Sequence, residues 1–222
     1  MGMPIHAWHL SLVVGVSTIG MALLLYGSEP TDVEGPLLAE GALPVLPAQT
    51  AGGGEVLLEV GVNELGFVDD IVVLTDTPPF TERVREAVGA WRFHPARSED
   101  GPQQGRVLVA GLYRAPTLFS GTTAGTASVV LGESSPEIPY PIQTLTPSYP
   151  PLASGAGQAL LEIAVAESGE VEDARLLRAT PGFENTSLDA LRRWRFRPAE
   201  RAGLSIPATV WVILAYPQPT VP

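Results

Sequence analysis

The chain has 222 residues, with 24 acidic and 13 basic side chains and a formal net charge of −11 at pH 7. This charge disfavours nucleic acid as a partner, because a polyanion would be repelled. The chain has no cysteine, which excludes disulfides, thiolate metal sites, thiol nucleophiles and lipid attachment through cysteine. Hydrophobic residues make up 45% and charged residues 17%, so the composition favours packed apolar elements over disorder.

The N-terminal segment, residues 7–26, contains no Asp, Glu, Lys or Arg. As a helix it would cover roughly 30 Å, the thickness of a hydrocarbon core. Trp8 and Tyr26 stand at its two ends, where aromatic rings favour the membrane interface. We therefore expect residues 1–27 to form an uncleaved membrane anchor, in which Ser11 and Gly15 have the spacing of a helix-packing pair. A cleaved signal peptide and a buried core helix are the alternatives.

The charges that follow this segment predict its orientation. The first basic residue after Tyr26 is Arg83, whereas acidic residues come earlier, at Glu29, Asp32, Glu34 and Glu40. A flank without Lys or Arg can be translocated, so the N-terminus is expected in the cytoplasm and the rest of the chain outside it. Residues 28–43 are predicted to be a linker, because they are acidic and contain proline.

The remainder of the chain contains an internal repeat. A shift of 103 residues places residues 52–116 on residues 155–219 without a gap, and 24 of the 65 pairs are identical. The block Trp-Arg-Phe-x-Pro-Ala recurs at residues 91–96 and 194–199. We therefore predict a first, degenerate domain at residues 44–116, a linker at 117–139, a second domain at 140–217 and a tail at 218–222.

Each copy is predicted to fold in the order strand, strand, helix, strand. Short β-branched or leucine-rich runs indicate strands, a glycine turn joins the first two, and apolar residues at helical spacing indicate the helix. The fold class is therefore α+β, with a helix that covers one face of a sheet behind an N-terminal transmembrane helix. The expected strands are residues 56–62, 68–74 and 107–113 in the first copy and 159–165, 171–177 and 209–216 in the second.

The second copy opens with Tyr149-Pro-Pro-Leu-Ala and carries Leu-Asp-Ala-Leu-Arg-Arg-Trp-Arg-Phe-Arg-Pro-Ala at residues 188–199. In these features it resembles the C-terminal domain of the TonB family across residues 140–217. The first copy resembles that domain more weakly, with Leu46 where the second copy has Tyr149. The resemblance implies a single-pass inner-membrane protein with its C-terminal domains in the periplasm.

The resemblance also implies a function and a partner. Members of the family transmit energy from a proton-driven motor complex of the inner membrane to outer-membrane transporters. They bind an extended transporter segment by strand addition, which uses the unpaired backbone groups of an edge strand. The candidate edge strand is the last one, formed by Thr209, Val210, Trp211, Val212, Ile213, Leu214, Ala215 and Tyr216.

Two further groups of residues are candidates for contacts with a partner. Tyr149 and Pro150 are expected either to shape the peptide groove or to hold the entry of the chain against the core. A basic cluster is a candidate contact for acidic peptides or cell-wall polymer, although a solvated helix end explains it as well. Its members are Arg192, Arg193, Arg195 and Arg197. Trp91 and Trp194 are expected in the core, because they lie on the apolar helical stripe.

A second function from a different class is a periplasmic scaffold that binds envelope proteins without energy coupling. The family's anchor carries Ser-x-x-x-His, and this chain has Ser17 where the histidine would fall. An enzyme is not expected, because His94 is the only histidine beyond the predicted anchor and no catalytic or metal-binding motif occurs. No catalytic residue, metal or cofactor is therefore assigned, and a homo-oligomer is left open.

Overall fold

The computed structural model describes residues 34–46, 52–116 and 129–219. We call residues 34–116 the first half, 129–136 the connecting segment and 137–219 the second half. The first half contains β1 (Leu37–Glu40), β2 (Gly54–Val62), β3 (Val68–Asp76), α1 (Phe80–Gly89), β4 (Arg92–His94), β5 (Ala96–Ser98), β6 (Gly101–Gln103) and β7 (Gly105–Tyr113). The connecting segment contains β8 (Val129–Val130).

The second half has the same order of elements as the first. It contains β9 (Tyr140–Gln143), β10 (Gly157–Val165), β11 (Val171–Ala179), α2 (Glu184–Leu191), β12 (Arg195–Arg197), β13 (Ala199–Arg201), β14 (Leu204–Ile206) and β15 (Ala208–Tyr216). Every strand of the first half recurs 103 residues later with the same bounds. The predicted α+β class is confirmed, and the order strand, strand, helix, strand describes the long elements of both halves.

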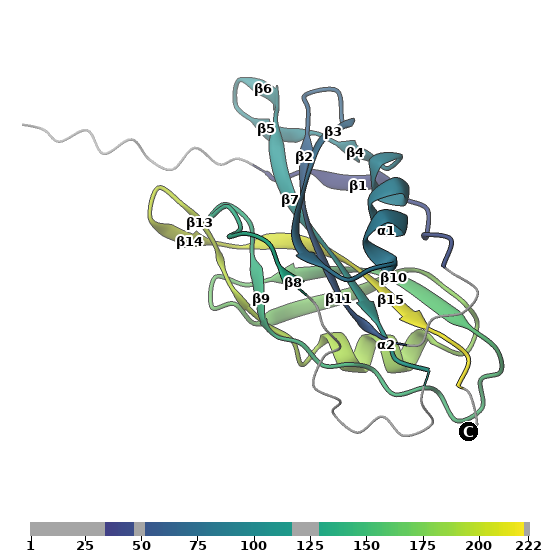
Figure 1. The fold of residues 1–222 in the computed structure, drawn as a ribbon. Coiled ribbons are helices and arrows are strands. Elements are labelled where there is room, and N and C mark those ends of the chain that lie inside the picture. Colours follow the sequence, from purple (N-terminus) through teal and green to yellow (C-terminus); the bar gives the residue numbers. More distant parts are fainter. Residues whose placement is uncertain (1–33, 47–51, 117–128, 220–222) are drawn as a thin grey trace, which may run out of the picture.

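One sheet of seven strands runs through both halves in the order β11-β10-β15-β7-β2-β3-β8 (Figure 1). Its two central strands, β15 and β7, are parallel neighbours that pair from Val210 with Leu108 to Ala215 with Tyr113. The other strand pairs of this sheet are antiparallel. On one side of this parallel junction the order is β15, β10, β11, and on the other side it is the equivalent β7, β2, β3. The two halves are therefore related by an approximate twofold axis that runs parallel to the strands.

The two helices lie on opposite faces of this sheet (Figure 1). Side chains alternate between the faces of a strand. The residues of β2 that pack with α1 are Val56, Leu58, Val60 and Val62. The residues of β10 that pack with α2 are Ala159, Leu161, Ile163 and Val165. A twofold axis along the strands exchanges the two faces, which explains why the same local sequence pattern puts the helices on different sides.

The repeated tryptophans are core residues, as predicted. Trp91 and Trp194 each follow a helix and are only 1% exposed. Their indole Nε1 atoms donate to backbone carbonyls of the chain that enters each half, Trp91 to Ala42 at 2.9 Å and Trp194 to Leu145 at 3.2 Å. Each tryptophan therefore joins the helix end to the entering segment and leaves no polar atom unpaired.

The entering segments belong to the folded halves, which corrects the predicted linkers. Within residues 28–43, β1 pairs with β4, and Leu38 packs against the core. Within residues 117–139, β8 pairs with β3, and Ile138 is 1% exposed. These segments are too short and irregular to show a periodic pattern, because their pairing depends on strands distant in the sequence.

Among the residues described, neither helix has the length and apolar character needed to cross a bilayer. The predicted anchor, including Ser11 and Gly15, lies outside the described residues.

Candidate functional site at the sheet edges

The strand predicted to be an edge is central in the structure. β15 pairs with β10 along its whole length and with β7 from Val210 to Ala215. The expected edge position of residues 209–216 is therefore wrong. Within its own copy, β15 is the last strand and has a partner on one side only, which is why the sequence suggested an edge. In the structure, β7 of the other half pairs with the remaining side. Trp211 and Ile213 are fully buried as part of this junction.

The open edge of the sheet is instead β11. It is the terminal strand of the seven, and no described strand pairs with its outer side. An edge strand of nine residues presents a row of unpaired N–H and C=O groups, which is the template needed for strand addition. The sequence analysis missed this site, because a hairpin has two sides and local patterns do not show which one is covered.

The opposite end of the sheet already carries an added strand. β8 lies antiparallel to the outer side of β3, with Val130 opposite Thr75 and Val129 opposite Asp76. The N–H of Leu131 also donates to the carbonyl of Leu74 at 2.8 Å. An extended segment from a distant part of the chain thus completes the β3 edge. β11 is the counterpart of β3, and its edge lacks such a cover among the described residues.

The backbone groups that β11 directs outward can be identified from two contacts. The N–H of Thr180 donates inward to Gln158 of β10, at 2.8 Å. Because these groups alternate in direction along an antiparallel strand, the N–H of Ala179 points outward. Leu177 corresponds to Leu74, whose carbonyl accepts the bond from the connecting segment. Leu177 and Ala179 therefore define the acceptor and donor available to a guest strand.

Charged residues and bulges restrict what this edge can bind. The register of β11 against β10 shifts at two places, and the register of β3 against β2 shifts at the corresponding places. Bulges and charges protect edge strands against indiscriminate pairing. Four charged side chains of β11 are exposed, namely Glu172, Asp173, Arg175 and Arg178. Arg175 pairs with Glu162 at 2.8 Å, and Arg178 forms no ion pair with a described residue.

The contacts of Tyr149 favour the domain-entry interpretation over a peptide groove. Its hydroxyl donates to the carbonyl of Gly155 at 2.6 Å. Its ring packs edge-on against Phe183, with a centroid distance of 5.6 Å. The carbonyl of Pro150 accepts from Ala153 at 3.1 Å in a tight turn. Both residues are partly buried, and they hold the chain against the core of the second half.

The predicted basic cluster is divided among local partners. Arg192 pairs with Asp189 at 3.5 Å, Arg195 with Glu170 at 3.3 Å, and Arg197 donates to Ser134 at 2.6 Å. Arg193 is exposed. These contacts tie the arginines to α2, to a hairpin turn and to the connecting segment, so the structure does not assemble them into one basic surface.

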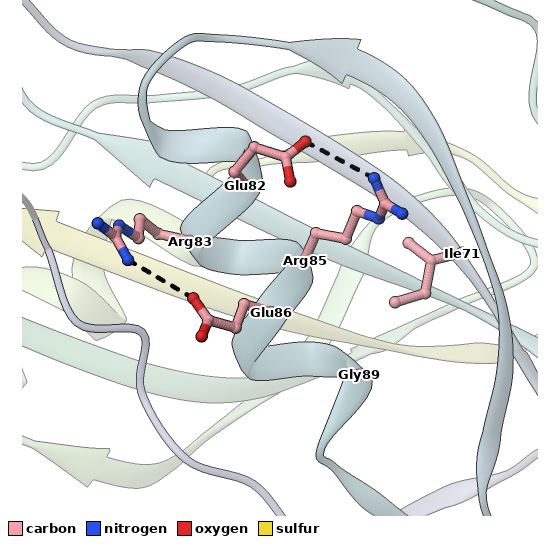
Figure 2. Close-up of a pocket in the computed structure, with 6 residues that line it drawn as sticks. All are labelled: Ile71, Glu82, Arg83, Arg85, Glu86 and Gly89. Carbon is pink, nitrogen blue, oxygen red and sulfur yellow. Dashed lines mark ion pairs between the residues drawn. The ribbon is translucent and has the colours of Figure 1, made fainter.

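A shallow pocket lies beside α1, in the first half. It is lined by Ile71, Glu82, Arg83, Arg85, Glu86 and Gly89. Figure 2 shows that its charged side chains pair with each other, Arg83 with Glu86 and Arg85 with Glu82, both at 3.6 Å. Such exposed pairs leave little unsatisfied charge for a ligand. The described residues contain no cluster of three or more His, Cys, Asp or Glu side chains that could hold a metal ion.

Buried ionisable groups mark the ends of the two central strands. Arg114 is 2% exposed, and its backbone N–H donates to the carbonyl of Ala215 at 3.0 Å. This bond extends the parallel pairing of β7 and β15. Burial lowers the pKa of Arg114 below its usual value. Burial also raises the pKa of the Tyr113 and Tyr216 hydroxyls. These groups lie inside the packed junction and therefore serve structure rather than chemistry.

Comparison with known proteins identifies the second half. Residues 146–216 match the family model described as the Gram-negative bacterial TonB protein C-terminal. A solution NMR structure of the Pseudomonas aeruginosa TonB C-terminal domain matches with 18% identity, covering 38% of this chain and 90% of that one, with a TM-score of 0.32. No curated protein matches the chain. The resemblance seen in the sequence is confirmed for the second half: residues 146–216 match the TonB C-terminal family.

Proposed function

We propose that the chain is a TonB-type adaptor of the inner membrane that binds extended segments of outer-membrane transporters in the periplasm. The observation that carries this proposal is the open β11 edge, which lies inside the segment that matches the family. In this proposal residues 7–26 anchor the chain with its N-terminus in the cytoplasm, and both halves are TonB C-terminal-like domains. The conserved register of 103 residues between their strands supports the second point.

Binding proceeds by strand addition to β11. A guest strand donates an N–H to the outward carbonyl of Leu177 and accepts from the outward N–H of Ala179. The pairing of β8 with β3 is the precedent for this geometry within the same molecule. Each backbone hydrogen bond contributes about 0.5–1.5 kcal/mol net, so several of them give affinity with little demand on guest sequence. Arg178 and the acidic residues at the start of β11 supply side-chain selectivity.

A periplasmic scaffold without energy coupling is the second candidate. The observation that favours it is Ser17, which stands where the family's anchor carries histidine. Intramembrane ionisable groups commonly carry the coupling to proton flow. The two candidates share the β11 edge and differ in the motor complex. Crosslinking of the chain to a transporter in cells, with and without a protonophore, separates them, since only the energy transducer loses its response when the proton gradient collapses.

The proposed binding site is tested with a pair of proline variants. Ala179→Pro removes the outward N–H of β11, and Asp76→Pro makes the same change at the corresponding position of β3, which β8 covers. Peptides from periplasm-facing segments of outer-membrane transporters are titrated by calorimetry or NMR. We expect Ala179→Pro to weaken binding at least tenfold, or by about 1.4 kcal/mol, and Asp76→Pro to bind as the wild type does. Equal binding by all three proteins, with matching melting temperatures, would exclude β11 as the site.

A further inference from the structure

The two bulges of β11 are placed symmetrically along the strand. One bulge puts Glu172 and Asp173 together opposite a single residue of β10, and the other does the same for Leu177 and Arg178. Each bulge begins two residues away from Arg175. Arg175 is therefore the midpoint of the edge, and the same spacing of residues is met in both directions from it.

The outward backbone groups share this midpoint. The carbonyl of Gln158 on β10 accepts from Thr180 at 2.8 Å, so every second residue of β10 from Gln158 onward faces β11. The partner of Arg175 in β10 is one of these residues. The backbone groups of Arg175 therefore point inward, and those of its neighbours Ala174 and Leu176 point outward. An antiparallel copy of β11, centred on the same residue, would place each Ala174 opposite a Leu176.

We propose that two copies of this chain associate through their β11 edges, antiparallel about a twofold axis at Arg175. The outward N–H and C=O groups of Ala174 in one copy pair with those of Leu176 in the other, and the two sheets become continuous. The inference deepens the proposed function and rests on it, because self-pairing occupies the edge that a transporter segment needs. A guest strand and a second copy therefore compete for β11.

The charges of β11 are complementary to themselves in this arrangement. The β10 partners of Asp173 and Arg178 are Ala164 and Leu160, four residues apart, so both side chains lie on the same face of the sheet. Both are exposed, and among the described residues neither forms an ion pair. Across the axis, the acidic bulge of each copy faces the bulge that carries Arg178 in the other. Two cross-strand pairs of opposite charge then stabilise this register.

The midpoint brings two arginines together, and each copy offsets this charge. The Arg175 residues of the two copies lie directly opposite, a position at which like charges are destabilising. In each copy, Arg175 already pairs with Glu162 at 2.8 Å. The axis therefore holds two arginines and two glutamates, and it carries no net charge.

The equivalent edge of the first half lacks these features. β3 has bulges at the corresponding places, but it has Asp70 and Thr75 where β11 has Asp173 and Arg178. A second copy would therefore meet no opposite charge there. β8 also pairs with Thr75 and occupies that end of the edge. Self-pairing is thus a property of the second half, and the assembly closes at two copies.

Charge reversal in the full-length chain tests this pairing. Asp173→Arg and Arg178→Asp each place like charges across the axis, whereas a mixture of the two variants places opposite charges there. Arg193→Asp is the matched control, because it makes the same charge change at an exposed site after α2. Sedimentation equilibrium in one mild detergent measures the association.

We expect the wild type and Arg193→Asp to dimerise equally. Each single β11 variant should associate at least tenfold more weakly, and the mixture should recover to within about threefold of the wild type. A monomeric wild type, or single variants that dimerise as the wild type does, would overturn the proposal. Failure of the mixture to recover would also overturn it, because only direct pairing across the axis predicts a heterodimer.

A single cysteine at the axis gives an independent readout, because the natural chain has none. Arg175→Cys is combined with Glu162→Gln, which keeps the axis uncharged, and Val72→Cys at the corresponding position of β3 is the control. Directly opposed residues of antiparallel strands are close enough for a disulfide. We expect the intermolecular disulfide to form at least tenfold faster at the axis than in the control. Equal rates would contradict the proposed register.

Titration of the wild-type dimer with transporter-derived peptides separates this inference from the proposed function. We expect bound peptide to dissociate the dimer, because both need β11. A charge-dependent dimer that binds no peptide would reject the proposed function alone. Peptide binding by a chain that does not self-associate would reject self-pairing alone, and a peptide that binds without dissociating the dimer would contradict the shared edge.

Discussion

Tyr113 and Tyr216 end the last long strand of each half, and their hydroxyls have different surroundings. The Tyr216 hydroxyl hydrogen bonds with Ser187 Oγ at 2.7 Å. The corresponding residue in the first half is Val84, and the buried Tyr113 hydroxyl has no hydrogen-bond partner among the residues that the structure describes. Tyr113 instead stacks on Phe80 with a centroid distance of 4.0 Å. The two copies thus surround the same tyrosine with a polar contact in the second half and an apolar one in the first.

This difference predicts that replacement of tyrosine by phenylalanine lowers stability in the second half but not in the first. Tyr216→Phe removes a buried hydrogen bond and leaves Ser187 with one partner fewer, so it should cost about 1 kcal/mol of unfolding free energy. Tyr113→Phe removes a hydroxyl that has no partner, so stability should stay within about 0.5 kcal/mol or rise. Denaturant unfolding of the two variants measures both effects. An equal loss in both variants would show that the Tyr113 hydroxyl has a partner in solution.

The same two hydroxyls predict alkaline destabilisation. Burial raises the pKa of both tyrosines above the ordinary value of 10. The folded state keeps the protons at a pH where the unfolded state releases them, so this stabilisation is complete below about pH 10 and is lost as the pH rises further. Unfolding free energy, measured from about pH 9 to 11, should decline less steeply in the double variant Tyr113→Phe/Tyr216→Phe. A slope equal to that of the wild type would reject this assignment.

At the scale of elements, the glycine of the hairpin turn in each half contacts the repeated Trp-Arg-Phe block of the same half. Gly66 and Gly169 have φ of +81°, and a β-carbon there would lie 1.9 Å from the carbonyl oxygen of Phe93 and 2.0 Å from that of Phe196, respectively. The carbonyls of both glycines accept from these same phenylalanines, at 2.9 and 2.8 Å. The turn therefore needs glycine for its backbone conformation and for the approach of the segment that follows the tryptophan.

Gly169→Ala should therefore destabilise the protein strongly. The methyl group clashes with a backbone atom, which cannot move without breaking the Phe196 bond, and we expect a loss of about 2–4 kcal/mol. The matched control is Gly182→Ala, because Gly182 also has positive φ, at +93°, but no atom lies within 4 Å of its β-carbon position. Thermal unfolding compares the two variants. Equal losses would mean that backbone conformation alone, without the clash, sets the cost.

The sequence predicted these elements well, because their signals are local. Short β-branched or leucine-rich runs gave the long strands, and the helical stripe gave both helices and the buried tryptophans. The short strands β1, β8 and β9 were missed, since two to four residues carry no period and gain their stability only from a partner strand.

At the scale of the whole molecule, the two halves share one core. Trp211 belongs to the second half but packs edge-on against Phe93 of the first, at a centroid distance of 5.4 Å. Leu160 of β10 lies in the same buried cluster as the α1 residues Val84 and Val88. Continuous strand pairing and a shared core join the two predicted domains into one packed unit, a point that the repeat in the sequence left open.

We therefore predict that the halves unfold together. Trp211→Ala should lower the unfolding free energy by about 3–5 kcal/mol and shift a single transition. Hydrogen exchange can follow β2 and β10 separately, and both should lose protection in the variant. Two transitions, with only that of the second half displaced, would show that the halves are independent in solution.

The sequence by itself determined the fold class, the repeat, the buried tryptophans and the family resemblance, because each depends on residues close in the chain or on direct similarity. Only the tertiary structure decided which strand edge remains open. The last long strands of the two copies, β7 and β15, hydrogen bond with each other through their backbones. That pairing joins residues about a hundred positions apart, so no local pattern records it, and it moves the candidate binding edge from β15 to β11.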